Sequence, residues 1–372
     1  MLTETMKWIL IIALSIPSFA FAQSGKRDVL NPDQLGIKEF KLEAQKTAPS
    51  EIELPFKSIK IIDSRYDTSK FGYMLEGGLS KKRMFRKMLL SGGVANAIES
   101  YYNDYYEGSF TQNDFELLIV MKRFWLAGNV RSNTKRVETA NSVGGTDNLY
   151  CKWEYYLGKD GKYLPVKRMD TIMRVDEDLA RYIGEEFSEK RLSYFKYVLK
   201  ALIEILDYSN AVKQFNTQPN KTLVEIKEFN KKMNLIPVLQ DTCFKKGVYL
   251  SFEDFKNNQP SIIDFQKKKM RYGTINTEVY LENMKGETIS NYWGYSDGKE
   301  FRYGMLGNDK IYRVQNTFCF FIKVVGYYIN QGNNNAYDRL FEDGVTTNNT
   351  LSKEKYEIWV PFQIDMETGE IY

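Results

Sequence analysis

Residues 149–175, LYCKWEYYLGKDGKYLPVKRMDTIMRV, form the pattern of two β-strands joined by a tight turn, and this segment decides the fold. Cys151, Trp153 and Tyr155 occupy alternate positions, which is typical of a strand with one buried face. Asp160-Gly161 is a strong signal for a two-residue hairpin loop. The sequence therefore predicts an antiparallel hairpin here, with Cys151 as a buried core thiol.

Further strands and two long helices are predicted around this hairpin. A strand rich in isoleucine ends at Asp63, and another covers residues 115–128. Apolar residues at helical spacing predict a helix over 80–106, interrupted at Gly92-Gly93, and a second over 176–208. The order β-α-β-β-β-α predicts an α+β domain with helices packed on one face of an antiparallel sheet.

The chain is expected to divide into two domains. Residues 23–50 are polar and are predicted to form an extended arm, and residues 51–208 form the α+β domain. Residues 209–222 lack periodicity and contain a proline, so they are predicted to form a linker. Residues 223–372 contain repeated tight-turn sequences, which predict a mainly β domain built as a meander.

The first 22 residues have the pattern of an export signal. An apolar run from Trp8 to Phe19 is followed by small residues at Ala20 and Ala22, which predicts cleavage between Ala22 and Gln23. The alternative is a retained membrane anchor, but the apolar run is shorter than the roughly 20 residues that a spanning helix needs. We therefore expect a protein in the periplasm, on the cell surface or secreted, with no transmembrane segment in the mature chain.

Composition excludes several classes of chemistry. The chain has no histidine, so Ser-His-Asp and Cys-His catalysis and imidazole metal sites are excluded. The net charge is only +4, and the lysine-rich segments 80–87 and 266–271 are expected to be solvated, so no nucleic-acid partner is predicted. There is no phosphate-binding loop or dinucleotide-binding glycine motif, so no cofactor is expected. No catalytic residue and no metal ligand is predicted.

The segment WGYSDGKEF, residues 293–301, matches the G-x-S-x-G pattern of a serine-hydrolase elbow. A strand follows the serine where an elbow needs a helix, so we interpret the segment as a hairpin with Asp297-Gly298 as its loop. In that register Trp293 lies opposite Arg302. The sequence then predicts an exposed aromatic surface in which Trp293, Tyr295 and Arg302 bind a partner, and the alternative is that Trp293 packs under a neighbouring loop.

Two further features of the sequence are candidate sites. Asp63 and Arg65, in DSRYD, lie at a strand end where a ligand could bind, although such residues more often close a turn by pairing with each other. Export would place the cysteines in an oxidising compartment, which makes Cys243 and Cys319 the candidate disulfide. Pairing cannot be read from a sequence.

The blocks IIDSRYDTSKFGY, KGVYLSFEDFKNNQPS, WGYSDGKEF and DMETGEIY resemble segments of a family of uncharacterised exported proteins of Gram-negative bacteria, whose function is unknown. The resemblance implies no activity. From the residues we carry two hypotheses: a non-enzymatic binding or scaffold protein for a glycan or an envelope protein, and a carboxylate-dependent hydrolase acting on a surface polysaccharide. Two carboxyl groups converging in one cleft, roughly 5 to 9 Å apart, would favour the hydrolase.

Overall fold

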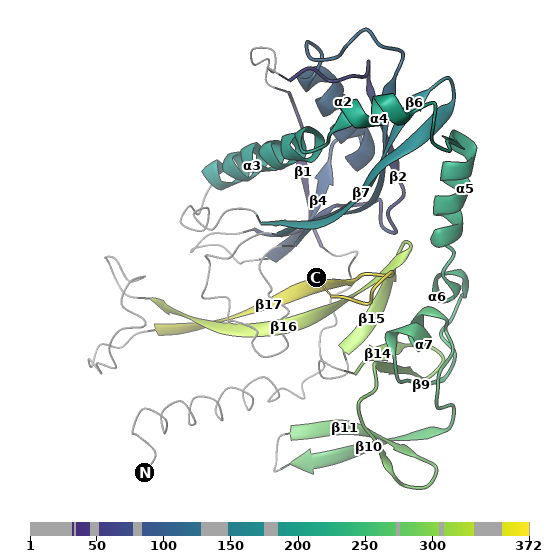
Figure 1. Ribbon diagram of the computed structural model, residues 1–372. Coiled ribbons are helices and arrows are strands. Elements are labelled where there is room, and N and C mark those ends of the chain that lie inside the picture. Colours follow the sequence, from purple (N-terminus) through teal and green to yellow (C-terminus); the bar gives the residue numbers. More distant parts are fainter. Residues whose placement is uncertain are drawn as a thin grey trace, which may run out of the picture.

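The computed structural model describes residues 32, 35–44, 52–76, 84–127, 148–174, 185–272, 276–304, 309–330 and 352–371, and structural statements below concern these residues. The predicted signal peptide, with its cleavage site at Ala22 and Gln23, lies outside them. The described chain is a mixed α+β structure with a mainly β second half, which confirms the predicted fold class (Figure 1).

The first sheet is eight-stranded and mixed. Its strand order is β1-β4-β3-β5-β6-β7-β8, with β2 beside β5. Parallel pairs join β1 to β4 and both β2 and β3 to β5, and the other pairs are antiparallel. The strands are β1 (Ile37–Phe40), β2 (Ile59–Asp63), β3 (Gly72–Glu76), β4 (Met84–Leu90), β5 (Glu116–Ala127), β6 (Asn148–Lys159), β7 (Lys162–Arg174) and β8 (Lys221–Thr222).

The hairpin of β6 and β7 confirms the prediction made from its turn sequence. Lys159 pairs with Lys162, and Asp160 and Gly161 between them have φ values of 50° and 75°. Two left-handed residues in a two-residue loop are the mark of a type I′ turn, whose twist matches that of the strands. Local chemistry therefore sets the pairing next to the turn, from Tyr156 with Pro165 to Lys159 with Lys162, and the register shifts beyond Tyr156.

Three helices cover one face of the first sheet. They are α2 (Val94–Tyr105), α3 (Glu185–Glu204) and α4 (Tyr208–Gln214), and their apolar side chains share one core with the inward residues of β5 and β6. The Tyr102 hydroxyl donates to the Leu199 carbonyl oxygen at 2.7 Å and so ties α2 to α3. Cys151 and Trp153 are fully buried in this core, as predicted for Cys151.

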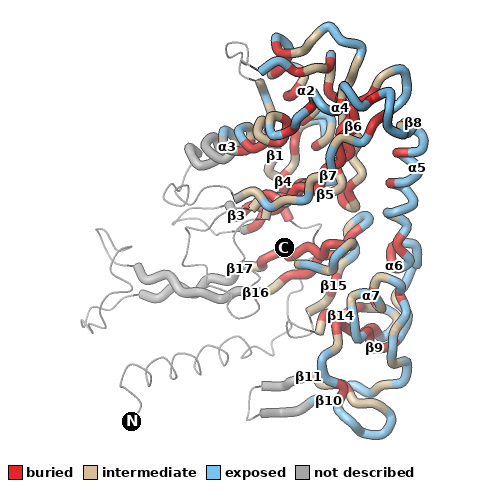
Figure 2. Tube along the Cα trace, viewed as in Figure 1, coloured by how far each residue is buried: buried red, intermediate tan, exposed pale blue. Residues whose placement is uncertain are grey.

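The opposite face of the first sheet has three zones along β5. At one end, Leu118 and Val120 pack against Ile226 of helix α5 (Leu223–Met233). At the other end, Trp125 belongs to a core shared with the second sheet. Lys122 lies between these two apolar zones. Figure 2 shows the buried strands of the two sheets facing each other, with α5 on the outside.

The second half contains two antiparallel sheets and two short helices. The larger has the order β17-β16-β15-β14-β13-β9, and the smaller has the order β10-β11-β12. Their bounds are β9 (Gly247–Tyr249), β10 (Phe265–Tyr272), β11 (Asn276–Asn283), β12 (Thr288–Ile289), β13 (Gly294–Ser296), β14 (Phe301–Tyr303), β15 (Asp309–Val314), β16 (Thr317–Asn330) and β17 (Ser352–Ile364), with helices α6 (Pro237–Gln240) and α7 (Phe252–Lys256). The run β13 to β17 is a meander, as predicted, but β10, β11 and β12 of the same predicted domain form a separate sheet.

The predicted helix over 80–106 was wrong in its first half. Residues 84–90 form β4, and the helix begins only at Val94. Gly92 and Gly93 have φ values of 81° and 88°, so they turn the chain in a conformation that a side chain disfavours. The glycine pair that was interpreted as an interruption is the boundary between a strand and a helix.

Two segments expected to be irregular contribute to the first sheet. The predicted arm, 23–50, contains β1, which pairs with β4. The predicted linker, 209–222, contains nearly all of α4 and also β8, which pairs with β7. Thr222 also begins α5 with a capping box to Glu225. The division of the chain into two domains stays a prediction.

The hairpin at 293–301 is real, but its predicted register was wrong. The pairs are Gly294 with Tyr303, Tyr295 with Arg302 and Ser296 with Phe301, so Trp293 does not lie opposite Arg302. The turn is centred one residue later than expected, because Gly298, at φ 93°, takes the first central position, which a type II′ turn reserves for glycine. Ser296 lies in a strand and is followed by a strand, which supports the turn interpretation over a nucleophile elbow.

Candidate functional site

The last residue of β2 and the loop that follows it supply two of the predicted site residues, Asp63 and Arg65. Arg65 donates from Nε and Nη2 to the two carboxylate oxygens of Asp63, at 2.8 and 2.7 Å, and from Nη1 to the Lys70 carbonyl oxygen at 2.8 Å. Arg65 is buried. A bidentate pair of this kind orders the loop, so Asp63 and Arg65 pair with each other, as the structural alternative predicted.

The same loop contains a second, more deeply buried ion pair. The Lys70 ammonium group contacts the Asp67 carboxylate, and both side chains are 1% exposed. Asp67 also accepts hydrogen bonds from the backbone N–H and the hydroxyl of Ser69, at 2.9 and 2.6 Å. The Lys70 ammonium lies 5.4 and 5.7 Å from the ring centroids of Tyr73 and Trp125, within cation–π range.

The C-terminal turn, which belongs to the second half of the chain, lies beside the loop after β2. The chain reverses at Glu367-Thr368-Gly369, and the Asp365 backbone N–H donates to the Glu370 carbonyl oxygen at 2.8 Å. The Asp365 side chain accepts from the backbone N–H groups of Glu367 and Thr368, at 2.7 and 3.1 Å. These bonds hold the acidic side chains of the turn in one orientation.

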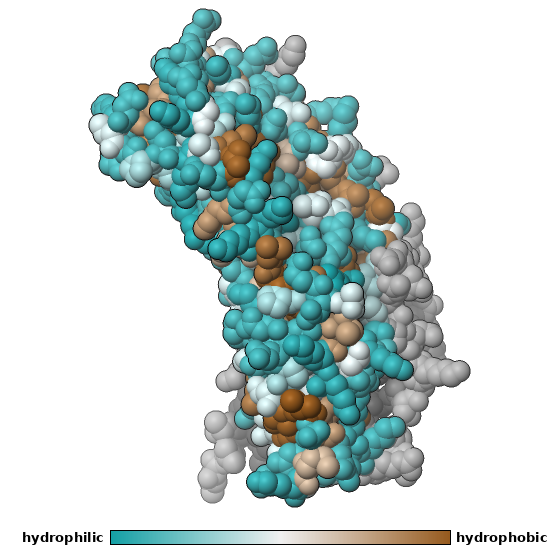
Figure 3. Space-filling view, turned by 90° about the vertical axis from the view of Figure 1, so that its right-hand side faces the viewer, coloured by the Kyte–Doolittle hydropathy of each residue, from teal (hydrophilic) through white to brown (hydrophobic). Residues whose placement is uncertain are grey.

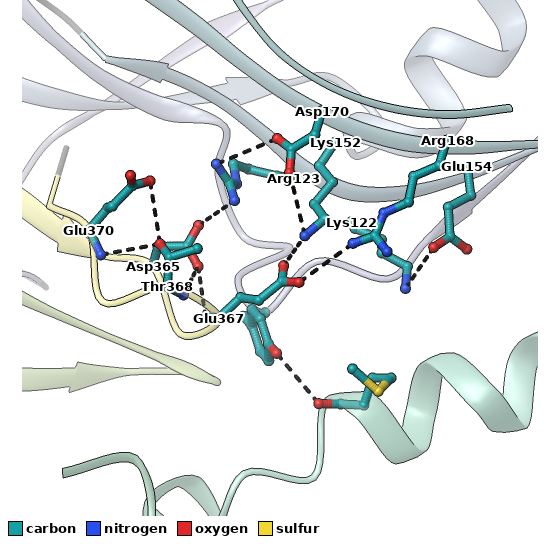
Figure 4. Close-up of polar contacts among 12 residues, drawn as sticks. Lys122, Arg123, Lys152, Glu154, Arg168, Asp170, Asp365, Glu367, Thr368 and Glu370 are labelled. Atoms are coloured by element: carbon teal, nitrogen blue, oxygen red, sulfur yellow. Dashed lines mark hydrogen bonds and ion pairs between the residues drawn. The ribbon is translucent and has the colours of Figure 1, made fainter. Parts of the chain in front are cut away.

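Charged side chains of β5, β6 and β7 meet this turn, as Figure 4 shows. Arg123 Nη2 lies 2.8 Å from Asp365 Oδ2, and Lys152 contacts Glu367. Arg168 lies 3.6 Å from the second oxygen of Glu367. We call this set the charged band; its members are Lys122, Arg123, Lys152, Glu154, Arg168 and Asp170 on the first sheet and Asp365 and Glu367 on the turn.

The charged band has equal numbers of positive and negative charges only when its residues on the first sheet and its residues on the C-terminal turn are counted together. The first sheet supplies four cations and two carboxylates, and the turn supplies the two carboxylates that complete the balance. Lys152 and Asp365 are almost completely buried, and each has an ion-pair partner across the contact: Lys152 contacts Glu367 of the turn, and Asp365 contacts Arg123 of β5. The band therefore joins the two sheets electrostatically.

A small pocket of about 40 Å³ lies between the loop after β2, β5 and the C-terminal turn. Tyr66 and Glu367 are only partly buried on its wall, whereas Gln363 is 7% exposed. Burial raises the pKa of Tyr66, and the carboxylates of Glu367 and Asp365 raise it further, so its hydroxyl stays protonated at neutral pH. The lining residues are Arg65, Tyr66, Asp67, Lys122, Arg123, Phe124, Trp125, Thr317, Gln363, Ile364, Asp365, Met366 and Glu367.

The pocket meets one requirement of carboxylate catalysis and lacks another. Asp67, Asp365 and Glu367 all line it, so acidic side chains converge there. Each of them is already bound to a lysine or an arginine in an ion pair, whereas an acid or base catalyst must be available to meet the substrate. Among the described residues, no group of three or more carboxylates and cysteines is arranged to hold a metal ion.

The other predicted binding residues lie elsewhere, in the second half of the chain. Trp293 is 8% exposed and packs on Phe255, with ring centroids 4.4 Å apart. Tyr295 is also buried, in a separate cluster between the two smaller sheets, and Arg302 is half-buried. The expectation of an exposed aromatic surface was therefore wrong, because the chain after β9 covers the rings. Trp293 packs as its alternative interpretation predicted.

The candidate disulfide between Cys243 and Cys319 is not formed. Cys319 is buried in β16, Cys243 is exposed, and neither is bonded to another cysteine. Cys319 shares a core with Tyr73 of the first sheet, so this cysteine serves packing between the sheets.

The residues of the charged band were not found from the sequence. Arg123, Lys152 and Arg168 each occupy one position of an alternating strand, where a cation normally indicates a solvated face. The signal that could have identified them is the unusual number of cations on three neighbouring strands, together with an acidic terminal turn. Only the tertiary structure brings those strands to that turn.

The outer surface beside α5 is largely hydrophilic, with apolar side chains in separate patches (Figure 3). No helix among the described residues combines the length and the apolar character needed to cross a bilayer. Scattered apolar residues of this kind are ordinary on a protein surface. This face therefore offers no site as well defined as the pocket.

Comparisons with known proteins give little further information. No protein-family model and no curated protein matches the chain. It is similar to the crystal structure of a Xanthomonas campestris protein of the family DUF330, with 10% identity and a TM-score of 0.29, over 49% of this chain and 100% of that chain. This likeness is too weak to support a conclusion about either fold or function.

Proposed function

We propose that this protein is a non-enzymatic binding or scaffold protein of the cell envelope or surface, with a glycan or an envelope protein as its partner. The observation that carries the proposal is the pairing within the pocket. Asp365 and Glu367 are bound to Arg123 and Lys152, which joins the two sheets, and Asp67 is bound to Lys70 within the loop after β2. A site whose carboxylates are all engaged in ion pairs suits recognition of a ligand better than acid–base catalysis.

Export is part of the proposal and rests on the N-terminal pattern. The apolar run and the small residues before Gln23 are typical of a cleaved signal. Intact-mass measurement of the native protein tests this point. The account expects a chain that begins at Gln23, and a mass that retains residues 8–22 would contradict it.

The functional proposal is tested with the chain from Gln23 to Tyr372 and a polysaccharide fraction from bacterial envelopes. We expect the immobilised protein to retain polysaccharide without releasing reducing ends over many hours. Release of reducing ends by the purified protein would favour the hydrolase alternative instead. Failure to retain any polysaccharide, together with capture of an envelope protein, would identify the partner as protein.

A further inference from the structure

One hydrogen-bond acceptor in the pocket is unused. The Oε1 atom of Gln363 is buried and has no hydrogen-bond partner among the described residues, and the whole residue is 7% exposed. Buried polar atoms without partners are rare, and each one implies a bound molecule or a loss of stability. Gln363 lines the pocket, so a rotation of its side chain that turns Oε1 toward this space would let a hydrogen-bond donor that enters there satisfy it.

The charges of the pocket favour a neutral donor. Its lining contains three cations, Arg65, Lys122 and Arg123, and three carboxylates, and each of these six groups has an ion-pair partner of opposite charge. A charged ligand would add an uncompensated charge to a balanced, poorly solvated cluster, which is costly. A hydroxyl group adds a donor without adding charge.

The size of the pocket limits what can enter. A single water needs about 10 to 15 Å³ of such space, so about 40 Å³ admits a hydroxymethyl group or one edge of a vicinal diol. A sugar ring is too large and must stay at the opening. Tyr66 is half-buried on the pocket wall, where its ring can stack on a sugar face, a contact that suits an aromatic side chain with a polar tip.

We propose that this pocket binds the hydroxymethyl group of a neutral hexose at the end of a glycan, with Gln363 Oε1 accepting a hydrogen bond from the sugar hydroxyl. The inference rests on the proposed function, because it names the ligand class of the same site. It does not require the glycan to be cleaved.

The test uses methyl glycosides of glucose, galactose and mannose as probes, measured by ligand-observed NMR with the chain from Gln23. Methyl xyloside is the matched probe, because it lacks the hydroxymethyl group. We expect at least one hexoside to bind at least tenfold more tightly than the xyloside. Equal affinities, or no hexoside binding at all, would overturn the proposal.

Variants separate this inference from the broader function. Gln363→Leu should weaken hexoside binding at least tenfold, whereas Gln240→Leu, at an exposed position of α6, should leave it unchanged. Gln363→Glu keeps an acceptor but adds a charge, and it replaces the leucine variant if that one does not fold; it should also weaken binding. If Gln363→Leu retains both hexoside and polysaccharide, the site is wrong while the proposed function stands. Tighter binding of ethylammonium than of any hexoside would show that the pocket selects a cation.

Discussion

The guanidinium group of Arg123 lies 2.8 Å from the carboxylate of Asp365, so a strand of the first sheet is bonded directly to the turn after the last strand of the second. The two side chains are 12% and 5% exposed. Around this contact lie an apolar core shared by the sheets and the pocket with its unpaired Gln363 oxygen. The candidate site therefore lies between the two sheets and is formed by residues of both.

Lys70→Met tests the buried pair beside the pocket. Methionine retains the apolar stem between Tyr73 and Trp125 but leaves the Asp67 carboxylate buried without its cation. We expect a loss of about 3 to 5 kcal/mol in the free energy of unfolding, measured in urea. Lys70→Met combined with Asp67→Asn should recover part of that loss. A single variant within about 1 kcal/mol of wild type would show that the pair is unimportant.

Trp293→Ala tests the corrected position of this side chain. The indole packs against Phe255, Phe301 and Tyr303, so its removal leaves a large cavity. We expect a loss of about 3 to 5 kcal/mol in unfolding free energy. Polysaccharide retention by the folded fraction should be unchanged. If the variant keeps its full stability but no longer retains polysaccharide, Trp293 belongs to an exposed binding surface, and its buried position is contradicted.

Two substitutions test the turn assigned to the hairpin at 293–301. Gly298→Ala should cost about 1 kcal/mol or more, because a Cβ is disfavoured at φ 93°. Ser296→Ala should cost about 1 kcal/mol, since Ser296 is fully buried and its Oγ accepts the Gly298 N–H at 3.0 Å. Both are measured by urea unfolding. An alanine at Gly298 that leaves stability unchanged would contradict the turn assignment.

The sequence was most informative where a structure depends on neighbouring residues. Asp160-Gly161 specified its hairpin, because turn chemistry involves residues close in the chain. Residues 84–90 were interpreted as helix because Phe85 and Met88 also fit helical spacing, and pairing with β3 and β1 determines the strand.

The candidate site was only half predictable. Asp63 and Arg65 are two residues apart, so their pairing has a local signal. Arg123 contacts Asp365, and Lys152 contacts Glu367, only in the folded structure. Each pair is more than 200 residues apart in the chain, so no local sequence pattern predicts the contact. The burial of Trp293 could not be predicted either. The helix that covers it, α7, follows β9 and is distant from Trp293 in the sequence.

Asp297 makes the stability of the hairpin sensitive to acid. Hydrogen bonds from the backbone N–H groups of Glu300 and Lys299, with the nearby Lys267 ammonium, lower the pKa of Asp297 from 3.8 to about 2. A lowered folded-state pKa contributes stability above the unfolded pKa, and this contribution is lost as the pH falls from about 4 through about 2. Thermal unfolding of wild type and Asp297→Asn should therefore converge over that range. Parallel pH profiles of the two proteins would contradict the assignment.

The most direct test of the account is a double-mutant cycle on Arg123→Met and Asp365→Asn, since asparagine keeps an acceptor for the turn while removing the charge. If the charges of the pocket serve to join the sheets, the coupling energy should be at least about 1.5 kcal/mol and should change little with salt. The more exposed pair Lys268 and Glu282, whose side chains are 46% and 19% exposed and lie 3.7 Å apart, should give less than about 0.5 kcal/mol when treated the same way with Lys268→Met and Glu282→Gln. A coupling of Arg123 and Asp365 within about 0.3 kcal/mol of zero would show that these charges do not depend on each other.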